Sequence, residues 1–390
     1  GSKIENTNNG IVNVTNFGYG IVGMATGKSP KDYGRDVSTG MAVEIINNGQ
    51  INVAGDNAIA IYADDNKGVA LNEISISNSH KIFLDGNTSI GIALRDSKNS
   101  GSGGILNTTG SGSSDIVTGT NGIGIYTENS VINLNSNYGI ETKDGGVGIY
   151  AVKSSIPTAT TLEYKYSGSN LGRGIAVVYT GVNATNNTNI KLVNSTKTVG
   201  GLIGIFDNGQ GTFTNNGTIT GSSTTKEFGI IGESNNIINN GNINLGNATS
   251  IKAPNIAIYS KTENSITNTA SIKVGNNSTG FYGYTINNSG DITVGSKGTA
   301  IYSQGGNVDI SSGTINIGSN QAIGVHTDGN SQIIRSNATS MNIEDNSFGF
   351  VNLGEGNRLI AQTANVSLKN NSMYIYSKNN ATINNSTNLR

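Results

Sequence analysis

The sequence predicts an all-β fold: a right-handed three-sided parallel β-helix (solenoid) with about 25 residues per rung and with loop insertions. Three observations predict this class. A short motif with alternating apolar residues recurs at a nearly fixed spacing. Glycine, with 55 of 390 residues, and asparagine mark the ends of each copy. Only 34% of the residues are hydrophobic, most of them Ile and Val, which suits a thin stacked core better than a thick globular one.

The spacing of the motif sets the rung length. One element of the motif has the form I-x-I-Y, and the last residues of its copies lie 18 to 29 positions apart. This period falls in the range of about 20–50 residues that is typical of solenoids and repeat arrays. The marker residues are Tyr126, Tyr150, Tyr179, Phe206, Gly232, Tyr259, Tyr284, Tyr302, His326, Val351 and Tyr376.

Each rung contains three short runs that predict strands. The first has the form G-x-I-x-V, as in GQINVAG from Gly49 and GDITVGS from Gly290. The second has the form G-I-x-I-Y, as in GIGIY from Gly122, and the third has the form N-x-I-x-N, as in NSITN from Asn264. Period-two alternation places the apolar residues of a run on one face. The residues predicted to face inward include Ile123, Ile125, Ile243, Leu245, Ile292, Val294, Ile315 and Ile317, whereas Thr293 is predicted to face outward.

Turn residues join these runs into one continuous chain. Asn-Gly, Gly-Asn and Gly-Ser pairs tolerate the left-handed backbone that sharp corners need. Three strands and three corners per rung give a three-sided coil. We expect a single domain over residues 1–390, in which Gly1 and Ser2 are a cloning scar and the remainder is a fragment of a longer protein.

Insertions are expected where the period stretches, at about residues 24–42, 96–121 and 151–171. The three prolines, Pro30, Pro157 and Pro254, all lie outside the predicted strands. That placement agrees with the strand assignment, because proline cannot donate to a parallel ladder.

Two insertions carry the candidate partner-binding residues, since binding residues concentrate on loops held by a rigid scaffold. The segments are EYKYSGSNLGR from Glu163 and KDYGRD from Lys31. The candidates are Tyr164, Lys165, Tyr166, Arg173, Tyr33 and Arg35. The alternative is that both clusters are solvated turns with ordinary tyrosines.

The marker tyrosines follow an inward Ile by one residue, so they should point outward and form an aromatic ladder up the exterior. This ladder has two interpretations. Stacked rings can fix the register of successive rungs, or the ladder can be a platform for sugars or for a partner protein.

Catalytic groups are sparse. His80 and His326 belong to different repeats, and Asp64 and Asp65 form the only adjacent acidic pair. An enzyme that cleaves polysaccharides would need convergent carboxylates, and Asp65 with Glu73 is the only pair considered. We therefore expect no catalytic residue, no metal site and no cofactor. The net charge of −1 argues against a nucleic-acid partner.

Three stretches resemble a known family. NNGTIT from Asn215, NNGNINLGN from Asn239 and SGDITVGSKGTAIYS from Ser289 are similar to the passenger repeats of the very large fusobacterial type V autotransporter adhesins, the RadD-like and galactose-inhibitable group. The resemblance covers most of the chain, and its motif is low in complexity. It implies a monomeric passenger displayed on the bacterial cell surface. Contact with the membrane would be made only through a C-terminal barrel that this fragment does not include.

The functional hypothesis is attachment. The resemblance implies binding to host cells or other bacteria through a glycan or protein receptor. A non-binding spacer is the first alternative, and a polysaccharide-active enzyme is the second.

Overall fold

Strands from successive turns pair in parallel, so the chain is an all-β solenoid of the predicted class. The computed structural model describes residues 2–25, 43–65, 74–96, 104–169, 172–194, 201–221, 226–261 and 263–387. Roughly 26 residues separate stacked strands, close to the predicted rung length. These described ranges contain no helix long and apolar enough to cross a membrane.

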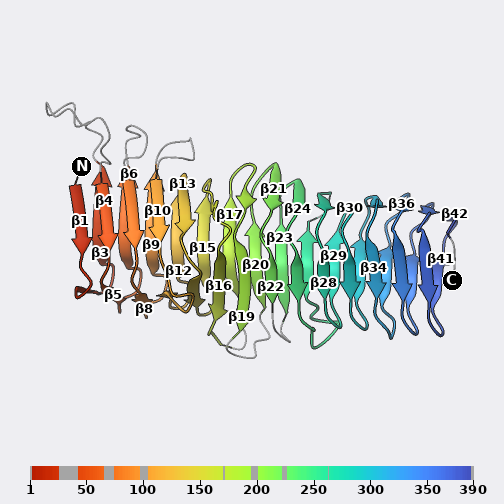
Figure 1. The fold of residues 1–390 in the computed structure, drawn as a ribbon, viewed down its shortest axis with the longest axis horizontal. Coiled ribbons are helices and arrows are strands. Elements are labelled where there is room, and N and C mark those ends of the chain that lie inside the picture. The colour runs from red at the N-terminus through yellow and green to blue at the C-terminus, as the bar shows by residue number, and fades with distance from the viewer. Residues whose placement is uncertain are drawn as a thin grey trace. The chain divides into compact units, whose positions relative to one another are not determined.

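Contacts group the chain into two units, Gly1–Thr198 and Val199–Arg390, called unit 1 and unit 2 below. Within each unit, Figure 1 shows strands of successive turns side by side. Each unit has three sheets, which fits a three-sided coil. The single domain expected over residues 1–390 stays a prediction.

Unit 1 contains sheets 1A, 1B and 1C, in each of which neighbouring strands come from successive turns. Sheet 1A contains β1 (Ser2–Asn6), β4 (Val43–Asn47), β7 (Ile74–Asn78), β10 (Gly104–Thr108) and β13 (Ser130–Leu134). Sheet 1B contains β2 (Ile11–Val14), β5 (Gln50–Val53), β8 (Ile82–Leu84), β11 (Ile116–Val117), β14 (Tyr138–Thr142), β16 (Thr161–Tyr166) and β19 (Asn189–Asn194). Sheet 1C contains β3 (Tyr19–Ala25), β6 (Ile59–Asp65), β9 (Ile90–Asp96), β12 (Ile123–Glu128), β15 (Val147–Val152) and β17 (Gly174–Thr180). The short strand β18 (Thr185–Asn186) follows β17.

Unit 2 contains sheets 2B, 2C and 2D. Sheet 2B contains β22 (Ile219–Gly221), β25 (Ile243–Leu245), β28 (Ile272–Val274), β31 (Ile292–Val294), β34 (Thr314–Ile317), β37 (Ser340–Ile343) and β40 (Asn365–Leu368). Sheet 2C contains β20 (Leu202–Asp207), β23 (Glu227–Gly232), β26 (Ile256–Ser260), β29 (Thr279–Gly283), β32 (Thr299–Ser303), β35 (Ile323–Thr327), β38 (Phe348–Asn352) and β41 (Met373–Ser377). Sheet 2D contains β21 (Thr212–Asn215), β24 (Asn236–Asn239), β27 (Ser265–Asn268), β30 (Thr285–Asn288), β33 (Val308–Ile310), β36 (Ile333–Ser336), β39 (Arg358–Ala361) and β42 (Thr382–Asn385).

The core consists of columns of apolar side chains stacked from turn to turn. In sheet 2B, Ile243, Ile272, Ile292, Ile315 and Met341 pair in sequence, and all are fully buried. Each such side chain contributes about 1.5–3 kcal/mol by leaving water. The alternation is as predicted, since Ile292 and its second neighbour in the strand are buried and the residue between them is partly exposed.

One predicted inward residue is wrong. Ile123 is half-exposed, whereas both Gly124 and Ile125 are buried. A Cβ built on Gly124 would lie 2.9 Å from the side chain of Ile140, so this position faces the interior. Two consecutive residues of β12 thus face inward, and strict alternation misplaces the residue before them.

Buried asparagines line the ends of four strands in sheet 2D. The Nδ2 of Asn215 donates to Oδ1 of Asn239 (2.8 Å), Asn239 donates to Asn268 (2.7 Å), and Asn268 donates to Asn288 (2.7 Å). Each Nδ2 also donates to the backbone carbonyl two residues further along its own turn. These asparagines, called the amide ladder below, are at most 2% exposed. A buried amide is tolerated when its donors and acceptors are paired, as they are in this ladder.

The structure contradicts two of the three expected insertions, because both segments contain strands of the stack. Within 96–121, β10 and β11 are members of sheets 1A and 1B, so these parts of the segment belong to the stack. Within 151–171, β16 pairs with β14 and β19. Short strands between Gly- and Ser-rich turns are hard to distinguish from loops. Residues 26–42, which make up most of the remaining insertion, lie outside the described residues. Pro157 and Pro254 lie outside strands, as predicted.

Candidate functional site

Two of the predicted binding tyrosines lie in the core. Tyr164 and Tyr166 belong to β16, and both side chains are 0% exposed. The hydroxyls of Tyr164 and Thr142 are 2.6 Å apart, and the Tyr164 hydroxyl also donates to the carbonyl of Gly146 (3.2 Å). The Tyr166 hydroxyl donates to the carboxylate of Asp144. The expected surface role of these tyrosines is wrong, because alternation along β16 turns both rings inward.

The other predicted residues do not gather around them. Lys165 faces outward and pairs with Glu141 at 2.8 Å. Burial by itself raises the pKa of Glu141, but hydrogen bonds from Lys165 and Ser114 outweigh it and hold the pKa below its usual range. Arg173 is exposed just before β17. The remaining two candidates, Tyr33 and Arg35, lie outside the described residues.

The exterior aromatic ladder exists in sheet 2C, with one change of member. Tyr259, Tyr282 and Tyr302 stack with ring centroids 5.3 and 4.8 Å apart and planes within 12° and 5° of parallel. His326 meets Tyr302 edge-on at 4.9 Å. Tyr282 therefore occupies the marker position that the sequence assigned to Tyr284.

Two further markers are also wrong. Tyr179 in β17 is fully buried and donates to Asn186 Oδ1 (3.0 Å). Ile231 rather than Gly232 aligns with Tyr259. In the stacked ladder, the ring of Tyr282 lies between the rings of Tyr259 and Tyr302. Two of the hydroxyls are also engaged, since Tyr302 donates to Asp328 (2.5 Å) and Tyr282 accepts from Gln304 (2.6 Å). This geometry favours the interpretation that the rings fix the register, because a sugar ring needs a free aromatic face to stack on.

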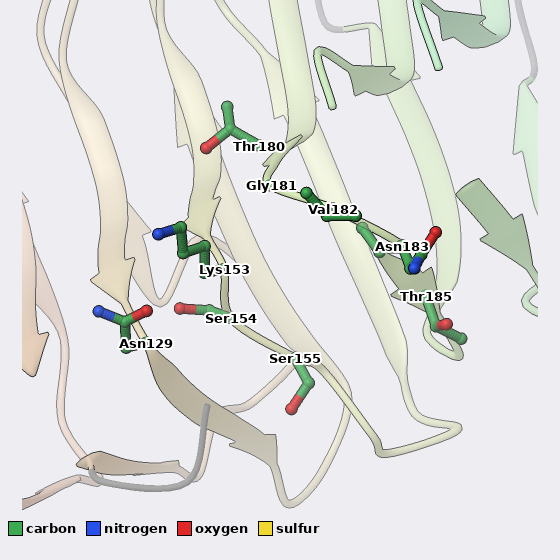
Figure 2. Close-up of a pocket in the computed structure, with 10 residues that line it drawn as sticks. Asn129, Lys153, Ser154, Ser155, Thr180, Gly181, Val182, Asn183 and Thr185 are labelled. Carbon is green, nitrogen blue, oxygen red and sulfur yellow. The ribbon is translucent and has the colours of Figure 1, made fainter. Parts of the chain in front are cut away.

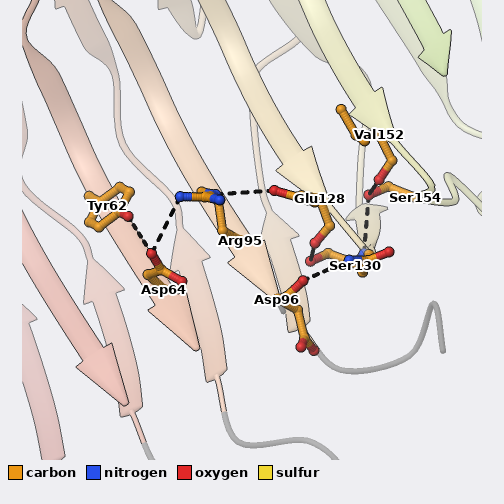
Figure 3. A network of polar contacts seen from close by, with 9 residues as sticks. Tyr62, Asp64, Arg95, Asp96, Glu128, Ser130, Val152 and Ser154 are labelled. Carbon is orange, nitrogen blue, oxygen red and sulfur yellow. Dashed lines mark hydrogen bonds and ion pairs between the residues drawn. The ribbon is translucent and has the colours of Figure 1, made fainter. Parts of the chain in front are cut away.

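A charged row crosses the outer surface of sheet 1C. Arg95 lies between Asp64 (3.7 Å) and Glu128 (3.1 Å), and Tyr62 donates to Asp64 (2.5 Å), as Figure 3 shows. The hydrogen bond to Glu128, its largest cause, raises the pKa of Arg95 above its ordinary value. Burial, followed by the Asp64 hydrogen bond, raises the pKa of Tyr62.

In the adjacent acidic pair, the Asp64 carboxylate is already paired with Arg95. The side chain of Asp65 and all of Glu73 lie outside the described residues. Among described residues, no three His, Asp or Glu side chains come close enough together to hold a metal ion.

A pocket of about 670 Å³ opens in unit 1 beyond β13, the last strand of sheet 1A. The next turn adds only isolated bridges there, from Ser155 to Val131 and from Ile156 to Asn186. We call this cavity the β13 pocket. Its lining residues are Asn129, Lys153, Ser154, Ser155, Thr180, Gly181, Val182, Asn183, Ala184 and Thr185. Figure 2 shows the first three on one side and Gly181 to Thr185 on the other.

One buried group in the β13 pocket is not satisfied. Asn129 is 4% exposed, and its Nδ2 donates to the carbonyl of Asp96 at 2.7 Å. That bond fixes the orientation of the amide, so Oδ1 points away from Asp96 and towards Ser154 (Figure 2). Oδ1 is buried and has no hydrogen-bond partner among the described residues. An unsatisfied buried acceptor costs about 1–3 kcal/mol.

The backbone around the pocket is held by tight corners. Lys153 has φ 46° and donates its N–H to the carbonyl of Thr180 (2.7 Å). Gly181 has φ 134°, and a Cβ there would lie 3.2 Å from the Lys153 side chain. Ser154 Oγ accepts from the N–H of Ser130 (3.1 Å) and donates to the carbonyl of Val152 (2.9 Å), as Figure 3 shows.

Sequence reasoning missed the β13 pocket. Its lining residues are ordinary corner residues, and no motif marks them. The usable signal was the absence of a third apolar run between Lys153 and Thr161, where Pro157 interrupts the pattern.

Comparison of the chain with family models, curated proteins and solved structures finds no match. The class that the fold defines is a parallel β-solenoid.

Proposed function

We propose that this chain is a ligand-binding segment of a bacterial cell-surface adhesin, and that it attaches the cell to host cells or to other bacteria. In this proposal the solenoid is displayed outside the cell as a monomer and binds a glycan or protein receptor. The resemblance of its repeats to autotransporter passengers supports the location, and the β13 pocket supports the binding role.

The β13 pocket is the single observation that carries the proposal. Its lining offers hydroxyls, amides and one ammonium group, yet it contains no carboxylate and no imidazole. General acid–base catalysis relies chiefly on those two groups, so the lining suits binding better than turnover. Most of the lining residues lie at corners of the stack, and the Lys153 corner is tied to the next turn by the hydrogen bond from its N–H to the carbonyl of Thr180 (2.7 Å).

A non-binding spacer is the second candidate, and the aromatic ladder of sheet 2C favours it. Rings that stack on one another stabilise the register of successive turns, and Tyr282 has a neighbouring ring on each face. Unit 2 would then be scaffold even where unit 1 binds.

The test is saturable binding of the labelled full chain to epithelial cells and to bacterial cells, followed by flow cytometry. An adhesin segment should show saturation and competition by the unlabelled chain. Heat-unfolded chain is the control. Prior treatment of the cells with protease or with a glycosidase mixture then separates a protein receptor from a glycan. Binding that does not saturate on either cell type would favour the spacer.

A further inference from the structure

The outer face of sheet 2C differs from the outer face of sheet 2B in the same unit. The outward residues that align with Thr293 in sheet 2B are all polar. In sheet 2C, two columns of outward residues run side by side, the first in register from Ile203 to Met373 and the second from Phe206 to Tyr376. Most residues of both columns are apolar or aromatic and partly exposed. We call these two columns the 2C stripe.

Each of the eight turns in the 2C stripe carries a single ring, counting the imidazole of His326. In six turns the ring lies in the second column beside a smaller residue, as Tyr302 lies beside Thr299. In the other two turns the ring lies in the first column and the second column is aliphatic. Those two pairs are Phe228 with Ile231 and Phe348 with Val351.

We propose that the 2C stripe is a contact surface for a second copy of this chain, with the two stacks parallel. A two-fold axis that lies between the faces and along the stack brings the first column of one copy onto the second column of the other. Every ring then meets a smaller residue, since Thr299 faces the partner's Tyr302 and Phe348 faces the partner's Val351. With the stacks antiparallel, the second column would meet itself, and rings would lie on rings.

The repeat of the stack also favours a second copy over an unrelated partner. Both copies have the same strand spacing of about 4.8 Å, so matched pairs recur in step along the whole sheet. Soluble monomers rarely leave a contiguous apolar patch of more than a few hundred Å² uncovered.

Charges at the edges of sheet 2C agree with the parallel arrangement. Lys226 precedes β23, and its ammonium lies 5.3 Å from the ring centroid of Phe228. Glu233 follows β23 and is exposed, with Lys261 at 3.6 Å. The same two-fold axis reverses the strand direction across the contact, so it brings Lys226 towards the partner's Glu233.

The area of the 2C stripe predicts a weak pair. Eight strands of about five residues cover roughly 34 by 17 Å, or about 600 Å² per copy. Standard interfaces bury about 800 Å² per partner. The inference therefore goes beyond the proposed function and is compatible with it, because a chain that is a monomer when dilute pairs only where copies are crowded.

The experiment is sedimentation velocity of the full chain over a range of concentrations. We expect a monomer at about 1 µM and a growing share of dimer above a Kd of about 100 µM. Thr299→Asp places a charge in the stripe against the partner's Tyr302 and should weaken pairing at least about tenfold. Thr293→Asp is the matched control, since both threonines are partly exposed and face outward in the same turn. It should leave pairing unchanged, with circular dichroism confirming that both variants fold.

A second pair of variants tests the matching of ring and smaller residue. Val351→Phe adds apolar surface, yet it should weaken pairing severalfold because its ring would meet the partner's Phe348. Adding Phe348→Val to that change exchanges the two side chains and should restore wild-type pairing. A merely adhesive apolar patch would respond to Val351→Phe in the opposite direction.

The proposal is overturned if the wild-type chain stays monomeric at 0.3 mM, about three times the expected Kd, if Thr293→Asp weakens pairing as much as Thr299→Asp, or if Val351→Phe strengthens it. Binding of the monomer to phosphatidylcholine vesicles, lost in Thr299→Asp, would instead assign the stripe to a lipid surface. Attachment to cells is measured with the dilute monomer. Attachment that persists in Thr299→Asp while pairing is lost separates this contact from the adhesin function.

Discussion

Tyr164 in unit 1 and Tyr282 in unit 2 both lie in ordinary strands of the stack, yet they face opposite ways. Tyr164 is fully buried and aligned in register with Ile140 and Leu192. Tyr282 stands outside its sheet and stacks between two other rings. The same side chain fills the core at Tyr164 and supports the stack from outside at Tyr282.

Glycines on the facing side of the interior make room for the inward ring of Tyr164. A Cβ added to Gly174 would lie 2.2 Å from the hydroxyl of Tyr164, and one added to Gly148 would lie 3.1 Å from its ring. In unit 2, a Cβ added to Gly280 would lie 3.5 Å from the side chain of Ile292, an ordinary contact, although it would lie 2.5 Å from the carbonyl oxygen of Ala300. Glycine thus leaves room beside the inward ring of Tyr164, and it also does so beside some Ile columns, since a Cβ added to Gly324 would lie 2.6 Å from Ile317.

The largest expected effect tests the inside–outside rule on which the comparison depends. Ile292→Asp should destabilise unit 2 by about 3–5 kcal/mol, because it buries an unpaired charge. Thr293→Asp, on the outer surface beside Lys273, should cost less than about 0.5 kcal/mol. Chemical denaturation measures both. Similar losses for the two variants would show that this strand is placed wrongly.

Truncating each tyrosine tests the comparison directly. Tyr164→Ala should cost about 3–5 kcal/mol, because it leaves a cavity and removes the partner of the Thr142 hydroxyl. Tyr282→Ala should cost about 1 kcal/mol, since it removes only a stack at the surface. The midpoints of thermal unfolding, followed by circular dichroism, should separate the two clearly. Equal midpoints would contradict the assignment of core and surface.

The glycine opposite Tyr164 provides a smaller and sharper test. Gly174→Ala should cost about 1–3 kcal/mol by overpacking against that ring. Gly280→Ala should cost less than Gly174→Ala, because Ala257 and Ala300 occupy the same position in the neighbouring turns and the Ile292 side chain leaves room. The free energies of unfolding of the two variants, measured in urea, provide the comparison. A neutral Gly174→Ala would mean that the interior of unit 1 has spare room.

The smallest effect concerns the end of the ladder. Burial lowers the pKa of His326, and the nearby Asp328 opposes that shift. The folded state therefore favours the neutral imidazole, so stability should fall as the pH drops below the ordinary histidine pKa of about 6.5. His326→Tyr should extend the stack, add about 0.5–1 kcal/mol at pH 7, and remove this histidine's contribution to the acid-side loss. Stability curves at pH 5 and pH 7 for both proteins provide the measurement. If both proteins lost the same stability between pH 7 and pH 5, groups other than His326 would be responsible for the loss.

The sequence predicted the repeat well because the repeat is a local pattern. Ile292 and Val294 could be placed inside from their alternation alone, and two markers in unit 2 were misplaced by one or two residues, since Ile231 rather than Gly232 and Tyr282 rather than Tyr284 align with Tyr259. Long-range pairing of polar strands was not predictable in the same way. β16 has the sequence TLEYKY, and only its neighbours β14 and β19 show that its alternate residues fill a core.

The site was harder to predict than the fold. The β13 pocket exists because one turn lacks a full strand beyond β13, and such an absence leaves no motif in the sequence. The unsatisfied oxygen of Asn129 depends on which way one amide turns, and that is decided by the Asp96 carbonyl, a group 33 positions away. Composition and spacing carry no information about such a contact.

The amide ladder in sheet 2D gives the chain a direction. Every link runs from an Asn in one turn to the Asn in the following turn, so each completed turn offers one N–H forward and receives one from behind. The series stops where Asn288 aligns with Ile310. Between Asn215 and Asn288, one turn can replace another and the hydrogen bonds to the turns before and after it stay the same. Duplication or deletion of a whole turn in this stretch would then change the length of the solenoid without changing its bonding. The loss of a single residue would interrupt the series. The number of turns can therefore vary while the fold stays the same.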